Sequence, residues 1–151
     1  MKKSNKNSTK LVDYKINIKL KLASLWTVMI FLYIYTDYFT LMMPGKIEAY
    51  MSQDLGIFKI TPFILVIFAL ILIVPSLMIF LSLVLRPIIN KWLNIVVAIV
   101  WSSMSFLILI SDLFDGSLPW SAFYDLYQLV EIVIFIIIIR TSLKWPKEEG
   151  L

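Results

Sequence analysis

The chain has 151 residues, of which 60% are hydrophobic and 16% are charged, and its formal net charge at pH 7 is +4. Soluble domains are about 45–50% apolar and about 25% charged, so the composition excludes an ordinary water-soluble domain, which could not cover this much apolar surface. The absence of cysteine and histidine excludes disulfides, thiolate-bound metals, bis-histidine haem and a histidine general base. We therefore expect no cofactor and no bound metal.

Residues 1–21 are predicted to form a basic cytoplasmic segment whose first ten residues are disordered. Seven lysines precede the first apolar run. We interpret this charge as a topogenic flank that also attracts anionic headgroups, rather than as an arm for binding nucleic acid. Residues 11–21 alternate apolar and basic side chains, which is a strand pattern in isolation. Beside a membrane span, an interfacial helical turn with snorkelling lysines is the preferred interpretation.

Four apolar runs follow, and each has the roughly 20 residues that a helix needs to cross a bilayer. The predicted spans are 22–43, 62–85, 92–111 and 119–139. An outer loop (44–61, with a short helical turn around 47–51) joins the first two spans, and a cytoplasmic loop (86–91) joins the second and third. A second outer loop (112–118) joins the third and fourth spans, and a cytoplasmic tail (140–151) follows the fourth. The first span is too long for a signal peptide. Short loops make sequential helices neighbours, so the predicted fold is an all-α membrane protein, an antiparallel up-down four-helix transmembrane bundle.

The distribution of Lys and Arg predicts the orientation. Twelve of these residues fall on the side of the termini and two on the opposite side, which by the positive-inside rule places both termini in the cytoplasm. The protein is therefore predicted to be a multi-pass protein of the inner or plasma membrane. Trp26, Trp92, Trp120 and Trp145 fall near predicted interfaces, as anchoring indoles do, and Trp101 falls mid-span.

Proline and glycine positions agree with these spans. Only Pro75 falls inside a span, where it should kink the second helix, and Ser76 or a facing serine is expected to satisfy the freed carbonyl. All glycines lie outside the spans. The absence of a GxxxG motif and of glycine-broken helices counts against a channel or a large-amplitude transporter.

Several sequence strings together resemble a known family. They are KLKLASLW (19–26), FLYIYTDYF (31–39), MPGKIE (43–48) and PSLMIFLSLVLRPIINKWLNI (75–95). Together they resemble a family of small bacterial four-span membrane proteins with no assigned function, over residues 13–146. The resemblance implies a bacterial inner-membrane protein of four helices, and it supplies no activity, cofactor or catalytic residue.

Three acids, Asp37, Asp125 and Glu131, fall within the predicted spans. A charge near the bilayer centre costs at least about 2.5–3.5 kcal/mol, so such residues normally face the protein interior. Asp37 and Asp125 lie about 7 Å and about 6 Å to the outside of their span midpoints, and Glu131 lies within about 3 Å of the midplane. No basic residue lies as deep. We therefore predict that at least Glu131 is protonated at neutral pH, and that Asp37 and Asp125 titrate as a coupled pair if they approach each other.

Tyrosine and glutamine side chains share the helical stripes that carry these acids. The candidate ligand- or proton-binding residues are Asp37, Asp125, Glu131, Tyr33, Tyr124, Tyr127 and Gln128, and no catalytic residue or metal ligand is expected. The opposite arc of the fourth span is apolar and should face lipid. A pocket rich in tyrosine and acid is therefore predicted between the first and fourth helices, with hydroxyl groups from Ser102, Ser103 and Ser105 on the third.

Three interpretations of the acids remain open. They form a site for a proton or ligand, or they only hydrogen-bond across helices at about 0.6 kcal/mol per bond. In the third interpretation the span boundaries are displaced, and Asp37 and Asp125 lie in headgroup water.

The predicted function is transport or binding of a proton or a small lipophilic or cationic ligand. Transport by alternating access would require the four helices to dimerise. The alternative is an accessory or scaffolding membrane protein whose buried acids are only structural. No serine-centred elbow, metal cluster or GxGD motif is present, so we do not expect an enzyme. Expected partners are membrane lipid and either a second copy or a larger membrane protein.

Overall fold

The computed structural model describes residues 15–56, 59–115 and 120–146. These residues form α1 (Ile18–Thr40), α2 (Lys46–Met51), α3 (Pro62–Val84), α4 (Pro87–Asp115) and α5 (Ala122–Leu143), with no strand among them. All of these helices except α2 are long and apolar enough to cross a membrane. The predicted all-α, four-helix class is therefore confirmed. The predicted disorder of residues 1–10 concerns a segment outside the described residues.

Local capping explains where the helices begin. The side-chain oxygen of Asn17 accepts a hydrogen bond from the backbone N–H of Lys19 at 2.9 Å, and the hydroxyl of Thr61 accepts one from Ile64 at 3.3 Å. These caps satisfy N–H groups that have no partner within the first turn. α4 begins at Pro87, where a proline loses no helical hydrogen bond.

The observed helix bounds differ from the predicted spans at several ends. α1 starts before the predicted span 22–43 and ends earlier, and α5 is displaced toward the C-terminus relative to 119–139. α4 extends into both predicted loops, 86–91 and 112–118. The predicted spans were limited by hydropathy, whereas a helix continues through polar residues wherever its hydrogen bonds can continue. The short turn expected in the first outer loop is present as α2.

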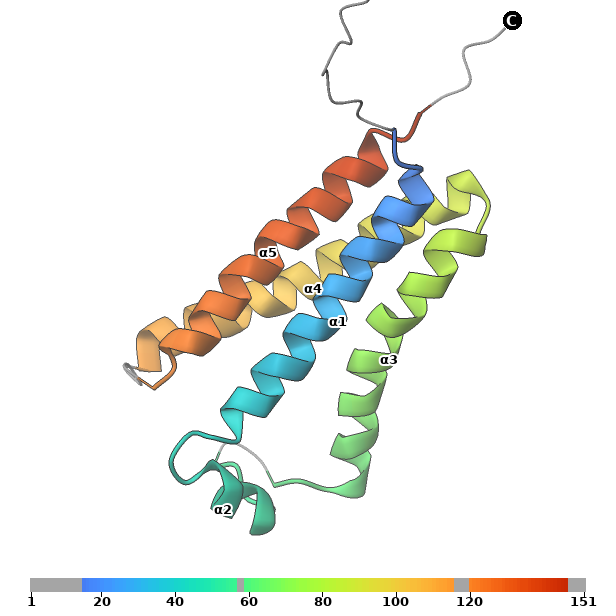
Figure 1. The fold of residues 1–151 in the computed structure, drawn as a ribbon. Coiled ribbons are helices and arrows are strands. Elements are labelled where there is room, and N and C mark those ends of the chain that lie inside the picture. Colours follow the sequence, from blue (N-terminus) through green and yellow to red (C-terminus); the bar gives the residue numbers. More distant parts are fainter. Residues whose placement is uncertain (1–14, 57–58, 116–119, 147–151) are drawn as a thin grey trace, which may run out of the picture.

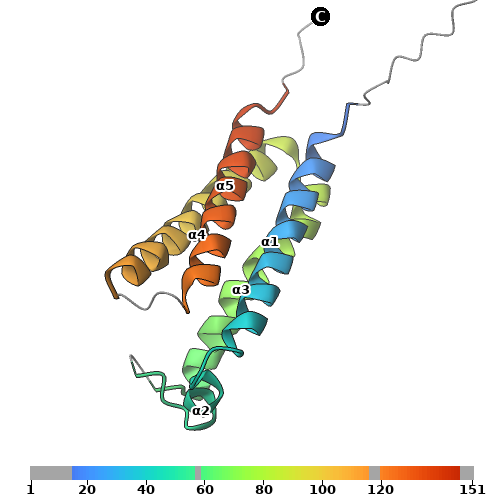
Figure 2. The same ribbon diagram turned by 60° about the vertical axis from the view of Figure 1, so that its left-hand side comes forward.

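The long helices associate as two pairs, α1 with α3 and α4 with α5 (Figures 1 and 2). α1 also contacts α5, whereas α3 and α4 make few contacts with each other. Lys15 and Pro146, which flank the bundle in sequence, lie at the same end, and α2 lies at the opposite end (Figure 1). The ammonium group of Lys19 donates a hydrogen bond to the carbonyl of Leu83, near the end of α3, at 3.2 Å. We call the two ends of the bundle the terminal end and the α2 end.

The buried interior differs between these two ends. The buried apolar side chains all lie at the midpoints of their helices or in the halves nearer the terminal end: Leu22, Ala23, Trp26, Met29, Met78, Ile95, Val97, Ala98, Ile134, Phe135 and Ile138. Toward the α2 end, the buried side chains among the described residues are all polar: Thr36, Ser105, Ser121, Gln128 and Glu131. The bundle therefore has an apolar block toward the terminal end and a polar interior toward the α2 end.

A buried hydrogen-bond network ties α1, α3 and α4 together within the apolar block. The indole N–H of Trp26 donates to Asn94 Oδ1 at 2.6 Å, and the Asn94 amide donates to Asn90 Oδ1 at 2.7 Å. Asn90 in turn donates to the carbonyl of Ser82 at 2.6 Å. Trp26 is 0% exposed, so it is not the interfacial anchor that its sequence position suggested. The sequence pattern could not show that a hydrogen-bond partner for its N–H lies inside the bundle.

The carbonyl that Pro75 leaves without a helical donor has a different hydrogen-bond partner from the expected one. Because Pro75 has no N–H, the carbonyl of Ile71 lacks its usual helical donor. The indole N–H of Trp101, from α4, donates to this carbonyl at 3.2 Å. The hydroxyl of Ser76 instead donates to Leu72 at 2.8 Å. An indole from a neighbouring helix, rather than a serine, therefore satisfies the freed carbonyl.

Candidate functional site

A row of polar side chains follows one face of α5 at the α2 end. Ser121, Asp125, Gln128 and Glu131 are separated by three or four residues, which places them about one helical turn apart on the same side. Ser121, Gln128 and Glu131 are buried, and Asp125 is partly buried. The row covers about 15 Å along the helix axis. The opposite arc of α5, represented by Leu126, is exposed, so the polar face points into the bundle.

Glu131 lies at the inner end of this row and is 1% exposed. Its Oε2 atom accepts a hydrogen bond from the hydroxyl of Ser105, on α4, at 2.8 Å. Its Oε1 atom is buried and has no hydrogen-bond partner. A buried carboxylate without a cation costs far more than a protonated carboxyl group, and pairing with a cation offsets part of that cost. A proton on Glu131, or a cation beside it, would therefore stabilise this arrangement.

The other members of the row also have oxygen atoms without partners. Ser121 Oγ, Asp125 Oδ1 and Gln128 Oε1 are buried and make no hydrogen bond within the described structure. A buried polar atom left unsatisfied costs about 1–3 kcal/mol, so a series of them is unfavourable unless water or a ligand binds there. The row therefore offers a line of acceptors from the α2 end to Glu131.

Two tyrosines and Asp37 lie around Glu131, and Asp112 lies near one of these tyrosines. Tyr33, on α1, lies within electrostatic range of Glu131 and Tyr124. Tyr124 interacts electrostatically with Glu131, Asp112 and Asp37, and Asp37 also interacts with Glu131. The site thus combines groups from α1, α4 and α5. All of these groups are acidic or phenolic, and they favour a cation or a proton over an anion.

Asp37 has Glu131 and Tyr124 among its electrostatic neighbours, and one buried oxygen of Asp125 has no hydrogen-bond partner. The coupled titration of Asp37 and Asp125 stays a prediction. Of the three serines expected to add hydroxyl groups, Ser105 reaches Glu131, whereas Ser103 bonds to the carbonyl of Ile99 in its own helix at 2.8 Å.

Tyr127 lines an apolar hollow. This hollow has a volume of about 320 Å³ and is lined by Phe39, Met42, Met43, Trp120, Phe123 and Tyr127. It joins the end of α1 to the beginning of α5 at the α2 end. Phe39 and Phe123 make an edge-to-face contact within it, with ring centroids 6.3 Å apart. Because Tyr127 and Glu131 are four residues apart on α5, the hollow lies on the side of the helix near the polar row.

Sequence reasoning missed three polar residues of the interior. Asp112 was assigned to an outer loop, but it lies on α4 and contributes to the electrostatics of Tyr124. Asn90 and Asn94 form the centre of the buried network. Their spacing of four residues, which places both amides on one side of the helix, was a signal that could have identified them. Among the described residues no group of His, Cys, Asp or Glu could hold a metal ion.

Comparison with known proteins adds a family and no activity. The model of a family of unknown function (DUF6326) matches residues 9–150, in agreement with the resemblance to a family without an assigned function. No curated protein and no solved structure matches the chain.

Proposed function

The chain belongs to this family of unknown function, and we propose that it is an integral membrane protein that binds a proton or a small lipophilic cation at Glu131. The main support is that one oxygen of this mid-helix carboxyl group is buried without a hydrogen-bond partner. A carboxyl group in that position can hold a proton, or it can release the proton and pair with a cation.

The proposed membrane setting follows from the four long apolar helices. Their outer faces are largely apolar and exposed, as lipid requires. We propose that the terminal end of the bundle faces the cytoplasm, because most Lys and Arg residues lie on that side. The α2 end then faces outward, and the polar row leads from the outer surface to Glu131 near the midplane.

The division of the interior supports binding from one side. Polar groups line the half toward the α2 end, and the apolar block begins just beyond Glu131, with Ile134 and Phe135. Trp26 and Phe135 pack edge to face across this block, with ring centroids 6.1 Å apart. A ligand that reaches Glu131 from the α2 end would meet a dry barrier there. We therefore place the occluded end of the site at Glu131.

The proposed ligand follows from the charges and aromatic groups. Glu131, Asp37 and Asp112 supply negative charge, and Tyr33 and Tyr124 supply aromatic faces that attract cations. The apolar hollow beside Tyr127 suits the hydrocarbon part of such a ligand. A lipophilic cation can pair with the carboxylates and pack against the aromatic faces, whereas an anion would be repelled by both.

Equilibrium binding of tetraphenylphosphonium to the purified protein in detergent tests this proposal. We expect the wild type to bind and Glu131→Gln to bind at least about tenfold more weakly, since the variant cannot become anionic. Glu48→Gln is the matched control, because Glu48 lies on α2 and is exposed. Equal binding by all three proteins, or no binding by the wild type at any pH, would refute a cation site at Glu131.

A second candidate function is that of an accessory protein that binds a larger membrane protein. The observation that favours it is the position of α3, which is the least buried of the long helices. Apart from its few contacts with α4, α3 packs on α1. Under this alternative, Glu131→Gln would leave the protein's physiological role intact, whereas substitutions on the exposed face of α3 would abolish it.

A further inference from the structure

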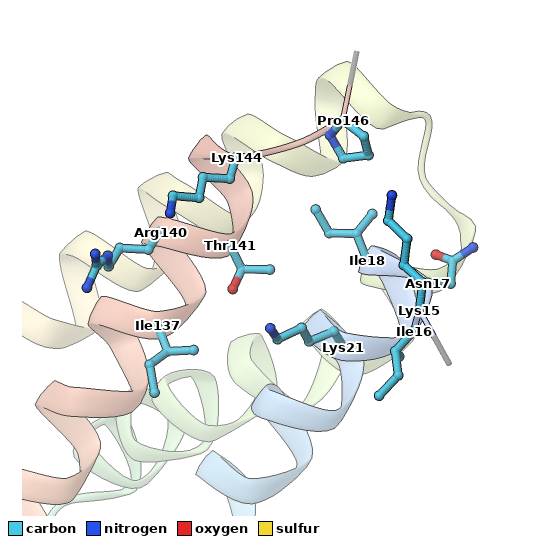
Figure 3. A pocket seen from close by; sticks show the side chains of 10 residues that line it. All are labelled: Lys15, Ile16, Asn17, Ile18, Lys21, Ile137, Arg140, Thr141, Lys144 and Pro146. Carbon is cyan, nitrogen blue, oxygen red and sulfur yellow. The ribbon is translucent and has the colours of Figure 1, made fainter. Parts of the chain in front are cut away.

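A basic cleft opens at the terminal end of the bundle, between the beginning of α1 and the end of α5 (Figure 3). Its volume is about 760 Å³, within the range of sites for small ligands. The described residues that line it are Lys15, Ile16, Asn17, Ile18, Lys21, Ile137, Arg140, Thr141, Lys144 and Pro146. This lining combines four cationic side chains with isoleucines and contains no carboxylate. It is far from Glu131, and the proposed cation site does not use it.

The lining side chains come from both helices, with polar and apolar groups on each. Lys21 extends from α1 toward α5, where Thr141 faces it across the cleft (Figure 3). Ile18 lies on the α1 side and Ile137 on the α5 side. Arg140 and Lys144 lie on α5, and their charged ends are turned away from α1 (Figure 3). Their exposed, flexible side chains can turn toward a bound anion, because long basic side chains reposition their charged ends at little cost.

The amino end of α1 adds to the positive potential of the cleft. The amino end of α1 carries a partial positive charge and favours an anion. The carboxyl end of α5 carries the opposite partial charge, but Arg140 and Lys144 lie in or next to its last turn and offset it. An anion at this position would therefore meet positive charge from both helices.

We infer that this cleft binds the phosphate headgroup of an anionic phospholipid from the surrounding bilayer. The inference rests on the membrane setting proposed above and is independent of the ligand at Glu131. If the helices span the bilayer, the cleft lies at the depth of the headgroups. Lys21, Arg140 and Thr141 can donate hydrogen bonds to phosphate oxygens, since arginine binds phosphate with two N–H groups at once. Ile16, Ile18 and Ile137 provide apolar contact for the glycerol and the first part of the acyl chains.

A site for a specific lipid explains the basic and apolar lining of the cleft better than a general attraction to the membrane surface does. Basic pockets at the cytoplasmic ends of spanning helices select anionic headgroups, whereas scattered surface lysines only raise the local lipid concentration. Arg86 and Lys91 lie near the turn between α3 and α4, at the same end of the bundle, and do not line the cleft. They provide a control of equal charge.

Native mass spectrometry of the full-length protein, with phosphatidylglycerol and phosphatidylcholine as probes, tests the inference. We expect the wild type to retain phosphatidylglycerol in preference to phosphatidylcholine. The double variant Arg140→Gln/Lys144→Gln should lose at least about tenfold in apparent phosphatidylglycerol affinity, because it removes two charged donors to the phosphate. The double variant Arg86→Gln/Lys91→Gln should lose less than about threefold, because these side chains do not line the cleft.

Two further measurements separate the alternatives. Thr141→Val removes a hydroxyl without changing charge and should also weaken phosphatidylglycerol retention, and its helicity by circular dichroism should match the wild type. Added inorganic phosphate at millimolar concentration should not displace the lipid. Equal loss in both double variants, no preference between the two lipids, or displacement by free phosphate would each overturn the assignment of a phospholipid site.

Discussion

Replacing Asn94 by alanine should substantially destabilise the bundle. Asn94 accepts hydrogen bonds from Trp26 at 2.6 Å and from Ser82 at 3.3 Å, and it donates to both the carbonyl and the side chain of Asn90. These residues are buried. The Asn94→Ala variant leaves the Trp26 N–H and the Asn90 side-chain oxygen buried without these partners.

The expected loss of stability in Asn94→Ala follows from these contacts. Hydrogen bonds between helices in membranes average about 0.6 kcal/mol each, and a buried group left unsatisfied costs about 1–3 kcal/mol. We therefore expect Asn94→Ala to lower the free energy of unfolding by about 2–4 kcal/mol. Trp26→Phe removes the same donor and also part of a fully buried indole, so its cost includes a cavity. The two effects should not be additive, because the side chains share a bond.

Reversible unfolding in mixed micelles with increasing sodium dodecyl sulfate, followed by circular dichroism, measures these changes. Ser103→Ala is the control, because Ser103 is exposed on the same helix and bonds only to its own backbone. It should change the free energy of unfolding by less than about 0.5 kcal/mol. A folded Asn94→Ala protein as stable as this control would refute the reasoning, and loss of cation binding by the folded variant would contradict the separation of the network from the Glu131 site.

Three further substitutions test other parts of the account. Ser105→Ala should weaken tetraphenylphosphonium binding by only about threefold in equilibrium dialysis, because it removes one hydrogen bond to Glu131; a loss as large as that of Glu131→Gln would contradict this. Trp101→Phe should lower the free energy of unfolding by about 1 kcal/mol, because the carbonyl of Ile71 loses its donor, and unchanged stability would argue against that bond. Gln128→Leu should weaken cation binding, because it removes a buried acceptor whose Oε1 atom has no hydrogen-bond partner; unchanged binding would show that Gln128 is not part of the site.

The number and type of the helices could be predicted from the sequence. A bilayer requires long apolar runs, and four such runs are present, so hydropathy alone identifies α1, α3, α4 and α5. The inward face of α5 also followed from the sequence, because Gln128 and Glu131 share a stripe opposite an apolar arc. Both inferences depend only on the local sequence, the first on hydropathy and the second on helical periodicity.

The pairing of side chains between helices could not be predicted in the same way. Sequence periodicity does not fix how one helix is rotated against another, so it could not select Ser105 over Ser103 as the partner of Glu131. For the same reason it could not show that Trp26 turns inward to Asn94. Asp112 was missed because its surroundings in sequence resemble a turn, whereas its backbone continues α4.

Infrared difference spectroscopy on reconstituted protein can record the carboxyl band of Glu131 before and after tetraphenylphosphonium is added. We predict that the wild type shows a protonated carboxyl group that disappears when the cation binds, and that this change is absent from Glu131→Gln. A Glu131 carboxyl group that is ionised before the cation is added, or a band that the cation leaves unchanged, would contradict the exchange of a proton for a cation at this site.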